Sequence, residues 1–234
     1  IQLLFNQFYM NTATRRTKNG PTIGQGGALY FWDQNRDVVI ANSTFKHNDA
    51  AINGAIGFDE VTNLQITSCL FEDNIGDYDS SCLGLGGVNL TLSYCRFINN
   101  VFRSQKPVTP AIYFIGSSHT LITNCYFENN YPYAIYADYH NEDMTIQDTI
   151  FEANESNGIL LLEEYVTATI TRCLFSNGNS IHGFSVSTSQ QQMSIQAISP
   201  VSSIGGGGAI ALQTTGYLLI SDCQFLHNQA TYGG

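Results

Sequence analysis

Hydrophobic and polar positions follow a unit that recurs along the whole chain. Each copy reads Leu or Ile, two mostly polar residues, a Cys, Ser, Thr or Asn, a variable residue and Phe, with Asn three residues later. The pattern is clearest at residues 66–74, 122–130 and 220–228. Eight copies occur in phase, most often 24 to 30 residues apart. Short apolar segments that repeat at about this length are typical of the coils of a parallel β-helix.

Two positions of the unit recur most regularly. One is a phenylalanine in all eight copies: Phe8, Phe45, Phe71, Phe97, Phe127, Phe151, Phe175 and Phe225. The other is asparagine in every copy but the seventh: Asn11, Asn48, Asn74, Asn100, Asn130, Asn154 and Asn228. Like residues on neighbouring coils lie about 4.8 Å apart. We therefore expect one ladder of phenylalanine rings and one ladder of inward Asn amides that hydrogen-bond along the stack.

A second strand per coil is predicted by a Gly-Gly-Ala-Leu/Ile element, seen at 26–29 and 207–210. The sequence thus predicts an all-β fold, a right-handed single-stranded parallel β-helix (a solenoid) of about eight coils. Residues 1–234 would form a single segment of a longer repeat array. Chain length varies only between the Asn position and the next Ala position. Insertion loops at 12–25, 101–109 and 179–206 are therefore expected at one corner.

These motifs carry a family resemblance. Gly26-Gly27-Ala28-Leu29 and Gly207-Gly208-Ala209-Ile210, together with Phe45-Lys46-His47-Asn48 and Phe97-Ile98-Asn99-Asn100, resemble the repeats of the chlamydial polymorphic outer membrane proteins. The resemblance covers nearly the whole chain. It implies a β-helix that acts as a surface adhesin.

Charge and hydropathy argue against two classes of function, nucleic-acid binding and membrane insertion. Only 12% of the residues are charged and the formal net charge is −10, so a basic nucleic-acid-binding face is not expected. No apolar run approaches the roughly 18–20 residues that cross a membrane. We expect no nucleic-acid partner, no membrane insertion by this segment, and no cofactor or metal.

Five cysteines occupy the same inward position of the unit: Cys69, Cys95, Cys125, Cys173 and Cys223. Neighbouring cysteines in this column lie within disulfide range. A disulfide among Cys69, Cys95 and Cys125, and another between Cys173 and Cys223, are therefore possible. We favour small buried thiols, because in-register side chains point alongside one another rather than at one another. The sixth, Cys82, is expected in the core of the other strand.

Carboxylates offer two candidate sites. Glu128 and Glu152 directly follow phenylalanines of consecutive units, so their predicted separation resembles that of the carboxylate pair of a retaining glycosidase. Three acidic residues, Asp73, Asp77 and Asp79, could hold Ca²⁺ with turn carbonyls. The alternative, which we favour in both cases, is a solvated acidic surface, since the strand spacing alone explains the first pair.

Three N-glycosylation sequons begin at Asn42, Asn89 and Asn154. Asn154 belongs to the inward Asn ladder, so we discount it. Asn42 and Asn89 should face outward and could carry glycans in a eukaryotic protein.

The Gly-Gly-Ala strand also places apolar residues at positions expected to face outward. Its alanines, such as Ala55, Ala111 and Ala134, belong here, as does a stripe formed by Tyr30, Tyr113, Tyr136 and Leu161. A solvated strand face is normally polar. We expect this stripe to contact another chain, a sugar or the chain's own insertions.

The leading functional hypothesis is a non-catalytic structural or adhesive rod or filament segment of a larger extracellular or cell-surface β-helix protein. Its partners would be neighbouring repeats, copies of itself stacked end to end or side by side, or cell-surface glycans. The alternatives are a carbohydrate-active β-helix enzyme, either a polysaccharide lyase or a hydrolase, and a passive glycan-binding rod.

Overall fold

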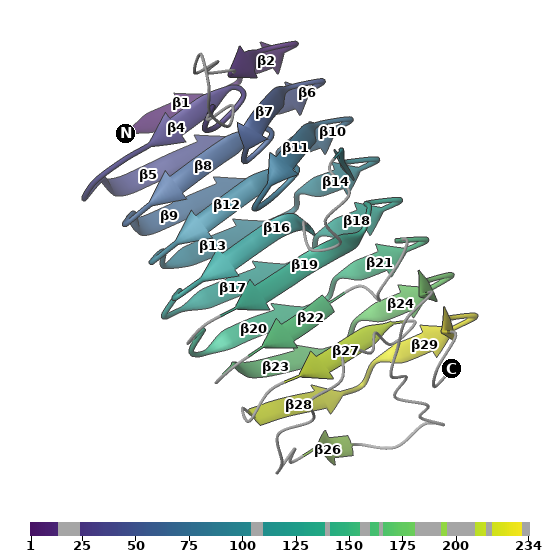
Figure 1. Cartoon of the computed structure of the whole chain (residues 1–234). Helices are drawn as coiled ribbons and strands as arrows, with labels where there is room; N and C mark the ends of the chain where they lie inside the picture. The colour runs from purple at the N-terminus through teal and green to yellow at the C-terminus, as the bar shows by residue number, and fades with distance from the viewer. Residues whose placement is uncertain are drawn as a thin grey trace.

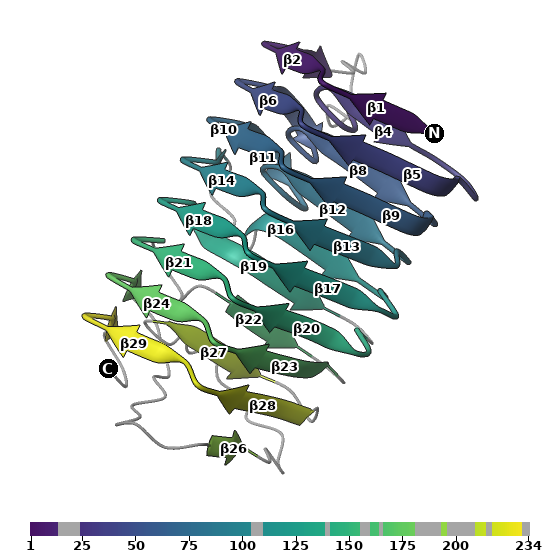
Figure 2. The same ribbon diagram turned by 180° about the vertical axis from the view of Figure 1, so that it is seen from behind.

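The computed structural model describes residues 1–13, 24–103, 110–138, 141–154, 160–163, 166–180, 193–195, 209–213 and 217–230. These residues contain strands, turns and bends but no helix. Consecutive coils stack along one axis, so strands far apart in the sequence lie side by side (Figures 1 and 2). The predicted class, an all-β parallel solenoid, is confirmed.

Two sheets run through all eight repeats. The first, which we name the Ile sheet, contains β1(Gln2–Leu4), β5(Arg36–Ala41), β9(Thr62–Thr67), β13(Leu90–Ser93), β17(Thr120–Thr123), β20(Met144–Gln147), β23(Thr167–Thr171) and β28(Tyr217–Ser221), with β26(Met193–Ile195) antiparallel at its end. The second, the Phe sheet, contains β2(Gln7–Tyr9), β6(Thr44–Lys46), β10(Leu70–Glu72), β14(Arg96–Ile98), β18(Tyr126–Glu128), β21(Ile150–Glu152), β24(Leu174–Ser176) and β29(Gln224–Leu226).

The opposite side of the coil is less regular. The Ala sheet contains β4(Leu29–Phe31), β8(Ile56–Asp59), β12(Leu83–Gly86), β16(Pro110–Ile115), β19(Tyr133–Asp138), β22(Leu160–Glu163) and β27(Ile210–Gln213). A corner sheet contains only β3(Thr12–Ala13), β7(Asp49–Ile52), β11(Ile75–Tyr78) and β15(Val101–Phe102), and β25(Asn179–Ser180) pairs with β30(Gln229–Ala230). Most of each expected insertion loop lies outside the described residues.

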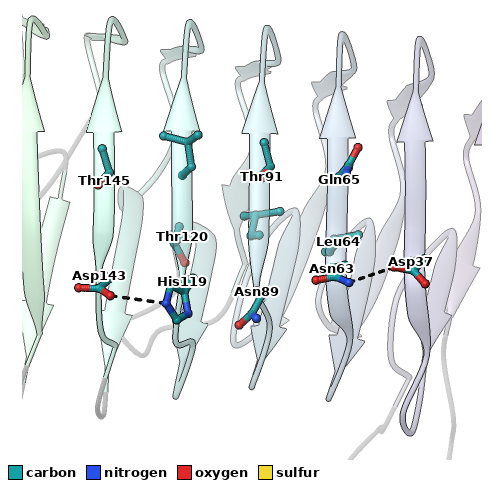
Figure 3. A pocket seen from close by; sticks show the side chains of 12 residues that line it. Asp37, Asn63, Leu64, Gln65, Asn89, Thr91, His119, Thr120, Asp143 and Thr145 are labelled. Carbon is teal, nitrogen blue, oxygen red and sulfur yellow. Dashed lines mark hydrogen bonds and ion pairs between the residues drawn. The ribbon is translucent and has the colours of Figure 1, made fainter.

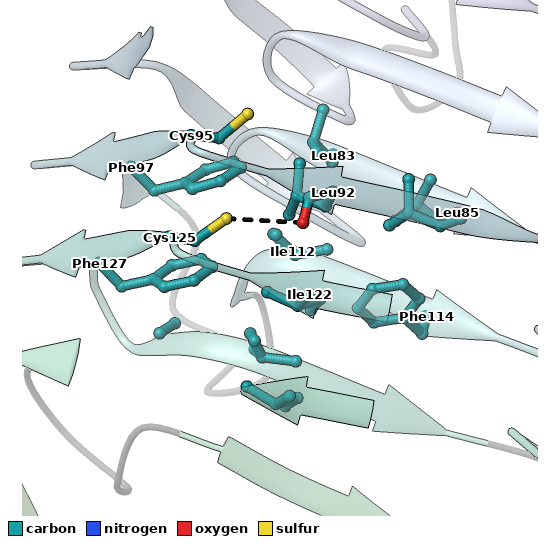
Figure 4. Packing of buried hydrophobic residues seen from close by; sticks show 14 of the residues in the cluster. Leu83, Leu85, Leu92, Cys95, Phe97, Ile112, Phe114, Ile122, Cys125 and Phe127 are labelled. Atoms are coloured by element: carbon teal, nitrogen blue, oxygen red, sulfur yellow. Dashed lines mark hydrogen bonds between the residues drawn. The ribbon is translucent and has the colours of Figure 1, made fainter. Parts of the chain in front are cut away.

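The Phe sheet aligns every phenylalanine of the repeat. Each ring lies directly beside its counterpart on the next strand, and ring centroids are 4.7–5.0 Å apart with nearly parallel planes. The Leu/Ile position stacks in the same way in the Ile sheet. Figure 4 shows the two rows meeting aliphatic residues of the Ala sheet, including Leu83 and Ile112, in one core.

Two corners of each coil depend on a single residue with left-handed backbone. The corner between the Ile and Phe sheets has φ of 50–57° at Phe5, Asn42, Ser68, Tyr94, Asn124, Asp148, Arg172 and Asp222. The corner after the Phe sheet has φ of 50–56° at Met10, His47, Asp73, Asn99, Asn129, Ala153, Asn177 and His227. Asn and Asp tolerate this conformation best, yet half of these sixteen residues are other types. The sheets on both sides therefore impose the bend.

The Asn ladder closes the second corner. Asn100 Oδ1 accepts hydrogen bonds from both the backbone N–H and the side-chain amide of Asn74, each at 3.0 Å. The Asn100 amide in turn donates to Asn130 Oδ1 and to the Phe71 carbonyl, both at 3.0 Å. This pattern runs from Asn11 to Asn154. The buried amides thus have hydrogen-bond partners, as burial requires.

The prediction that the alanines of the Gly-Gly-Ala strand face outward is wrong. Ala55, Ala111 and Ala134 are fully buried, and Ala55 and Ala134 belong to the core. The backbone N–H groups of Ala55 and of Ile56 both donate to the Cys82 carbonyl. This double donation marks a bend in the chain, so strict strand alternation does not start until after the alanine.

Candidate functional site

The outer face of the Ile sheet carries an open groove with a volume of 550 Å³ (Figure 3). It crosses strands from β5 to β20. Its lining residues are Asp37, Asn63, Leu64, Gln65, Asn89, Leu90, Thr91, His119, Thr120, Leu121, Asp143 and Thr145. Polar side chains dominate, and none of the described Lys or Arg residues lines the groove.

Two rows of outward side chains build this groove. One row comes from a residue next to the first residue of each strand, the second residue in β5 and β9 and the preceding one in the other three: Asp37, Asn63, Asn89, His119 and Asp143. The other comes from in-register positions within the strands: Gln65, Thr91, Leu121 and Thr145. Because strands in a sheet are spaced by about 4.8 Å, both rows repeat at that interval along the solenoid axis.

Short contacts order the ends of the first row. The Asn63 side-chain amide donates to Asp37 Oδ1 at 3.0 Å, and His119 Nε2 lies 3.6 Å from Asp143 Oδ2 (Figure 3). In the middle, Asn89 Oδ1 accepts a hydrogen bond from the Ser118 hydroxyl. The His119 and Asp143 side chains are each 70% exposed. At that exposure their pair contributes less than about 1 kcal/mol, so both groups remain available to a ligand.

The two carboxylates of the groove are far apart. Asp37 and Asp143 stand four strand spacings from each other, which is about 19 Å. Paired-carboxylate hydrolysis of a glycosidic bond requires about 5–10 Å. The groove therefore offers hydrogen-bonding groups to an extended ligand but does not bring two acids together.

The carboxylate pair predicted from sequence lies elsewhere, on the Phe sheet. Glu128 and Glu152 are direct neighbours on β18 and β21. Glu152 Oε2 accepts a hydrogen bond from the Tyr126 hydroxyl at 2.8 Å. Burial, followed by this bond to Glu152, raises the pKa of Tyr126, which keeps its hydroxyl protonated as a donor. One carboxylate of the pair is thus already engaged by a neighbouring side chain.

Two of the three acidic residues considered for Ca²⁺, Asp73 and Asp77, instead face cations. Asp73 lies 3.8 Å from Lys46 Nζ and 3.7 Å from His47 Nδ1, while Asp77 receives a 3.0 Å contact from Arg103. The same arginine also contacts Asp49. Within the described parts of the chain, no three His, Cys, Asp or Glu side chains form a group that could hold a metal ion.

All six cysteines are free thiols in this structure. Those at the corner of the Ile and Phe sheets donate to the carbonyl two residues earlier, as Cys95 does to Ser93 at 3.3 Å. Some also accept, as when the Cys69 N–H donates to Cys95 Sγ at 3.4 Å. Burial raises the pKa of Cys82 and of Cys95 well above the ordinary value. Cys82 and Cys95 therefore act as neutral, hydrogen-bonded core groups, whereas a hydrogen bond with a neighbouring thiol lowers the pKa of Cys69, Cys125 and Cys223.

The tyrosine stripe is not a continuous exposed surface. Tyr136 is only 5% exposed, and its ring stacks on that of Tyr113 at 5.4 Å and lies 6.3 Å from that of Tyr133. The Tyr113 hydroxyl donates to Asp138 Oδ2 at 3.3 Å. Tyr30 stands apart, because Gly57 and Gly84 separate it from Tyr113 in the register. The side chain of Leu161 lies outside the described residues.

The sequence pattern did not point to the groove. The repeat unit begins at its Leu/Ile position, whereas the row from Asp37 to Asp143 lies three residues earlier, where no single residue type occurs in most copies. Alignment of the eight units at their phenylalanines would have placed these polar residues in one column, and that was the available signal.

The comparisons with known proteins concern the fold. A model of the right-handed β-helix region matches residues 28–199 and 110–233, which together cover most of the chain. No curated protein and no solved structure gave a significant match. No helix long and apolar enough to cross a membrane occurs among the described residues. The predicted handedness is thereby confirmed, and the chain belongs to the right-handed β-helix family.

Proposed function

We propose that this chain is a non-catalytic, adhesive rod segment of a larger extracellular or cell-surface protein, and that it binds an extended neutral glycan along the Ile sheet. The observation that carries the proposal is the groove from Asp37 to Asp143, whose polar rows repeat at the strand spacing. A polymer of hydroxyl-bearing units can meet such a surface with contacts that recur at the strand spacing, although the side chain that makes them differs from coil to coil. The resemblance to the chlamydial surface proteins agrees with an adhesive role.

The charge of the groove favours a neutral glycan over an acidic one. Asp37 and Asp143 lie at its two ends, and in the part of the chain that the structure describes no Lys or Arg lines it. An acidic polysaccharide would meet like charges with no compensating cation, which disfavours its binding. The hydroxyls of a neutral glycan can instead donate hydrogen bonds to the carboxylates and to Gln65, and accept one from the amide of Asn89.

A binding assay with named polysaccharides tests this function. Purified chain is titrated with soluble β-glucan, mannan and xylan, and with polygalacturonate as the acidic probe. We expect binding to at least one neutral polymer and not to polygalacturonate. Gln65→Ala combined with His119→Ala should weaken binding about tenfold, the equivalent of 1.4 kcal/mol. Binding of the acidic polymer alone, or equal binding by the double variant, would overturn the proposal.

An enzyme is the second candidate, because Glu128 and Glu152 stand one strand spacing apart, near the separation of a retaining pair. The same polysaccharides are incubated with the chain and assayed for new reducing ends. We expect none above the level given by Glu128→Gln, and this variant should bind like the unaltered chain. Reducing ends that depend on Glu128 would replace the adhesive proposal with a hydrolase.

A further inference from the structure

The three N-glycosylation sequons occupy very different environments. Asn154 is completely buried, and its amide donates to the Phe127 carbonyl while its Oδ1 accepts from Asn130. Asn89 is half-buried, and its Oδ1 accepts a hydrogen bond from the Ser118 hydroxyl. Asn42 is exposed, and its side-chain amide has no hydrogen bond within the described residues. Of the three, only Asn42 is exposed and has neither its side-chain oxygen nor its side-chain nitrogen hydrogen-bonded within the described residues.

Local geometry makes Asn42 prominent. It is a left-handed corner residue, with φ of 50°, between β5 and β6. Its backbone N–H donates to the Thr67 carbonyl at 3.0 Å, so the corner is fixed while the side chain is not. Thr44, whose hydroxyl completes the sequon, lies two residues on at the start of β6.

A hollow of 380 Å³ begins at this residue. Its lining residues are Asn42, Ser43, Thr44, Ser68, Cys69, Leu70, Tyr94 and Arg96. The middle corner residue, Ser68, is small, whereas the next, Tyr94, is 63% exposed. The corner residues follow the strand spacing, so Tyr94 stands about 10 Å from Asn42. That is within the reach of the first two sugar rings of an attached glycan.

Arg96 closes the far side of the hollow. Its guanidinium carbon lies 5.6 Å from the centre of the Tyr126 ring, so its aliphatic stem borders the hollow while its charge is held over an aromatic face. Leu70 supplies a further apolar surface between Thr44 and this stem. The hollow therefore combines hydroxyls, an amide and an aromatic ring, the groups that bind a sugar's polar edge and apolar face.

We propose that Asn42 is an N-glycosylation site whose first sugars lie in this hollow against Tyr94. The inference rests on the extracellular placement in the proposed function, because the chain must enter a eukaryotic secretory pathway. There, an oligosaccharyltransferase joins the sugar C1 of a lipid-linked pyrophosphoryl oligosaccharide to Asn42 Nδ2. The C1–O bond to phosphate breaks, Nδ2 loses one proton, and the lipid pyrophosphate leaves.

The site test is secretion of the chain from a eukaryotic cell, followed by peptide mass spectrometry with and without peptide N-glycosidase. We expect full glycan occupancy at Asn42, lower occupancy at Asn89 and none at Asn154 in the folded protein. Thr44→Val keeps the β-branched shape and the asparagine but removes the sequon hydroxyl, so it should abolish modification at Asn42 alone. An unmodified Asn42, or a glycan on Asn154, would overturn the proposal.

The melting temperature tests whether the glycan lies in the hollow against Tyr94. Enzymatic trimming of the glycan to a single sugar, and then its complete removal, should lower the melting temperature of the secreted protein by about 3 °C. In Tyr94→Ala, the same treatment should leave the melting temperature unchanged. An equal fall in both proteins would show that the sugars do not lie against Tyr94. Polysaccharide binding in the groove is measured separately, so failure here leaves the adhesive proposal standing.

Discussion

The two sides of the coil differ in how strictly they repeat. On one side, the Ile and Phe sheets each carry one parallel strand from all eight repeats. In each repeat, the corner between these two strands contains one left-handed residue. On the other side, the Ala sheet has seven strands and the corner sheet four among the described residues. The stretch from the Leu/Ile position to the Asn position has nine residues in every repeat, whereas the length of the return path varies.

This difference in regularity gives the two sides different contributions to stability. A fixed path length places like residues on like positions, so phenylalanine stacks on phenylalanine and Asn bonds to Asn. The Ala sheet keeps one in-register aliphatic row, from Leu29 to Ile210. No ring or amide ladder runs through all its strands among the described residues, and aromatic side chains such as Tyr113 and Tyr136 pack there as a local cluster instead. Stability should therefore depend mainly on the regular side, and this can be tested one substitution at a time.

Removing one ring from the middle of the Phe stack should have the largest effect. Phe97 is fully buried between Phe71 and Phe127. Phe97→Ala removes a large core side chain and should lower the free energy of unfolding by about 4 kcal/mol. The matched change on the variable side, Tyr113→Ala, should cost about half as much because that ring is only half-buried. Urea denaturation measures both, and equal losses would contradict the comparison.

Breaking the Asn ladder should come next. Asn100→Ala leaves the N–H and amide of Asn74 without their shared acceptor, and the Phe71 carbonyl without a donor. Unpaired buried groups of this kind should lower the free energy of unfolding by about 3 kcal/mol. The neighbouring exposed residue gives the control, since Asn99→Ala should cost less than about 1 kcal/mol. A similar loss in both variants would mean that the ladder contributes no more than a surface turn.

Buried thiols should make the stability fall in alkali. Burial raises the pKa of Cys82 well above 9.0, so the folded state keeps this proton while the unfolded chain loses it above that pH. The Cys82 contribution is therefore complete below pH 9 and decreases by about 1.4 kcal/mol per pH unit above it. Denaturation curves between about pH 8 and 11 should show a shallower decline in Cys82→Ala. Identical slopes would show that this thiol ionises in the fold.

The smallest expected effect concerns the corner residues. Ala153 has φ of 50°, a conformation that costs alanine more than asparagine, and other coils place Asn99 and Asn129 at the same corner. Ala153→Asn should raise the free energy of unfolding by about 0.5 kcal/mol, and Asn129→Ala should lower it by a similar amount. Thermal melts of the two variants should shift in opposite directions. A shift in the same direction would mean that the side chains, not the backbone conformation, decide the outcome.

The regular side was the more predictable from sequence. The Phe and Asn positions recur in phase, and their register in the structure follows from that repeat alone. The left-handed backbone at the corners could not be predicted from sequence, because residues such as Phe5, Tyr94 and Arg172 have no preference for a positive φ. Burial of Ala55 could not be read either, since it depends on two successive N–H groups sharing one carbonyl. The groove emerges only when the coils are stacked.

The proposed function depends on the Ile-sheet groove, which is expected to bind a neutral glycan without cleaving it. The most direct measurement is a crystal structure of the chain soaked with a neutral hexasaccharide of the polymer that binds. We predict an intact, extended sugar chain lying along the axis from Asp37 to Asp143, with contacts to Gln65, Asn89 and His119. Density for cleaved sugar beside Glu128 and Glu152, or a sugar bound only on the Ala sheet, would contradict non-catalytic glycan binding in the groove.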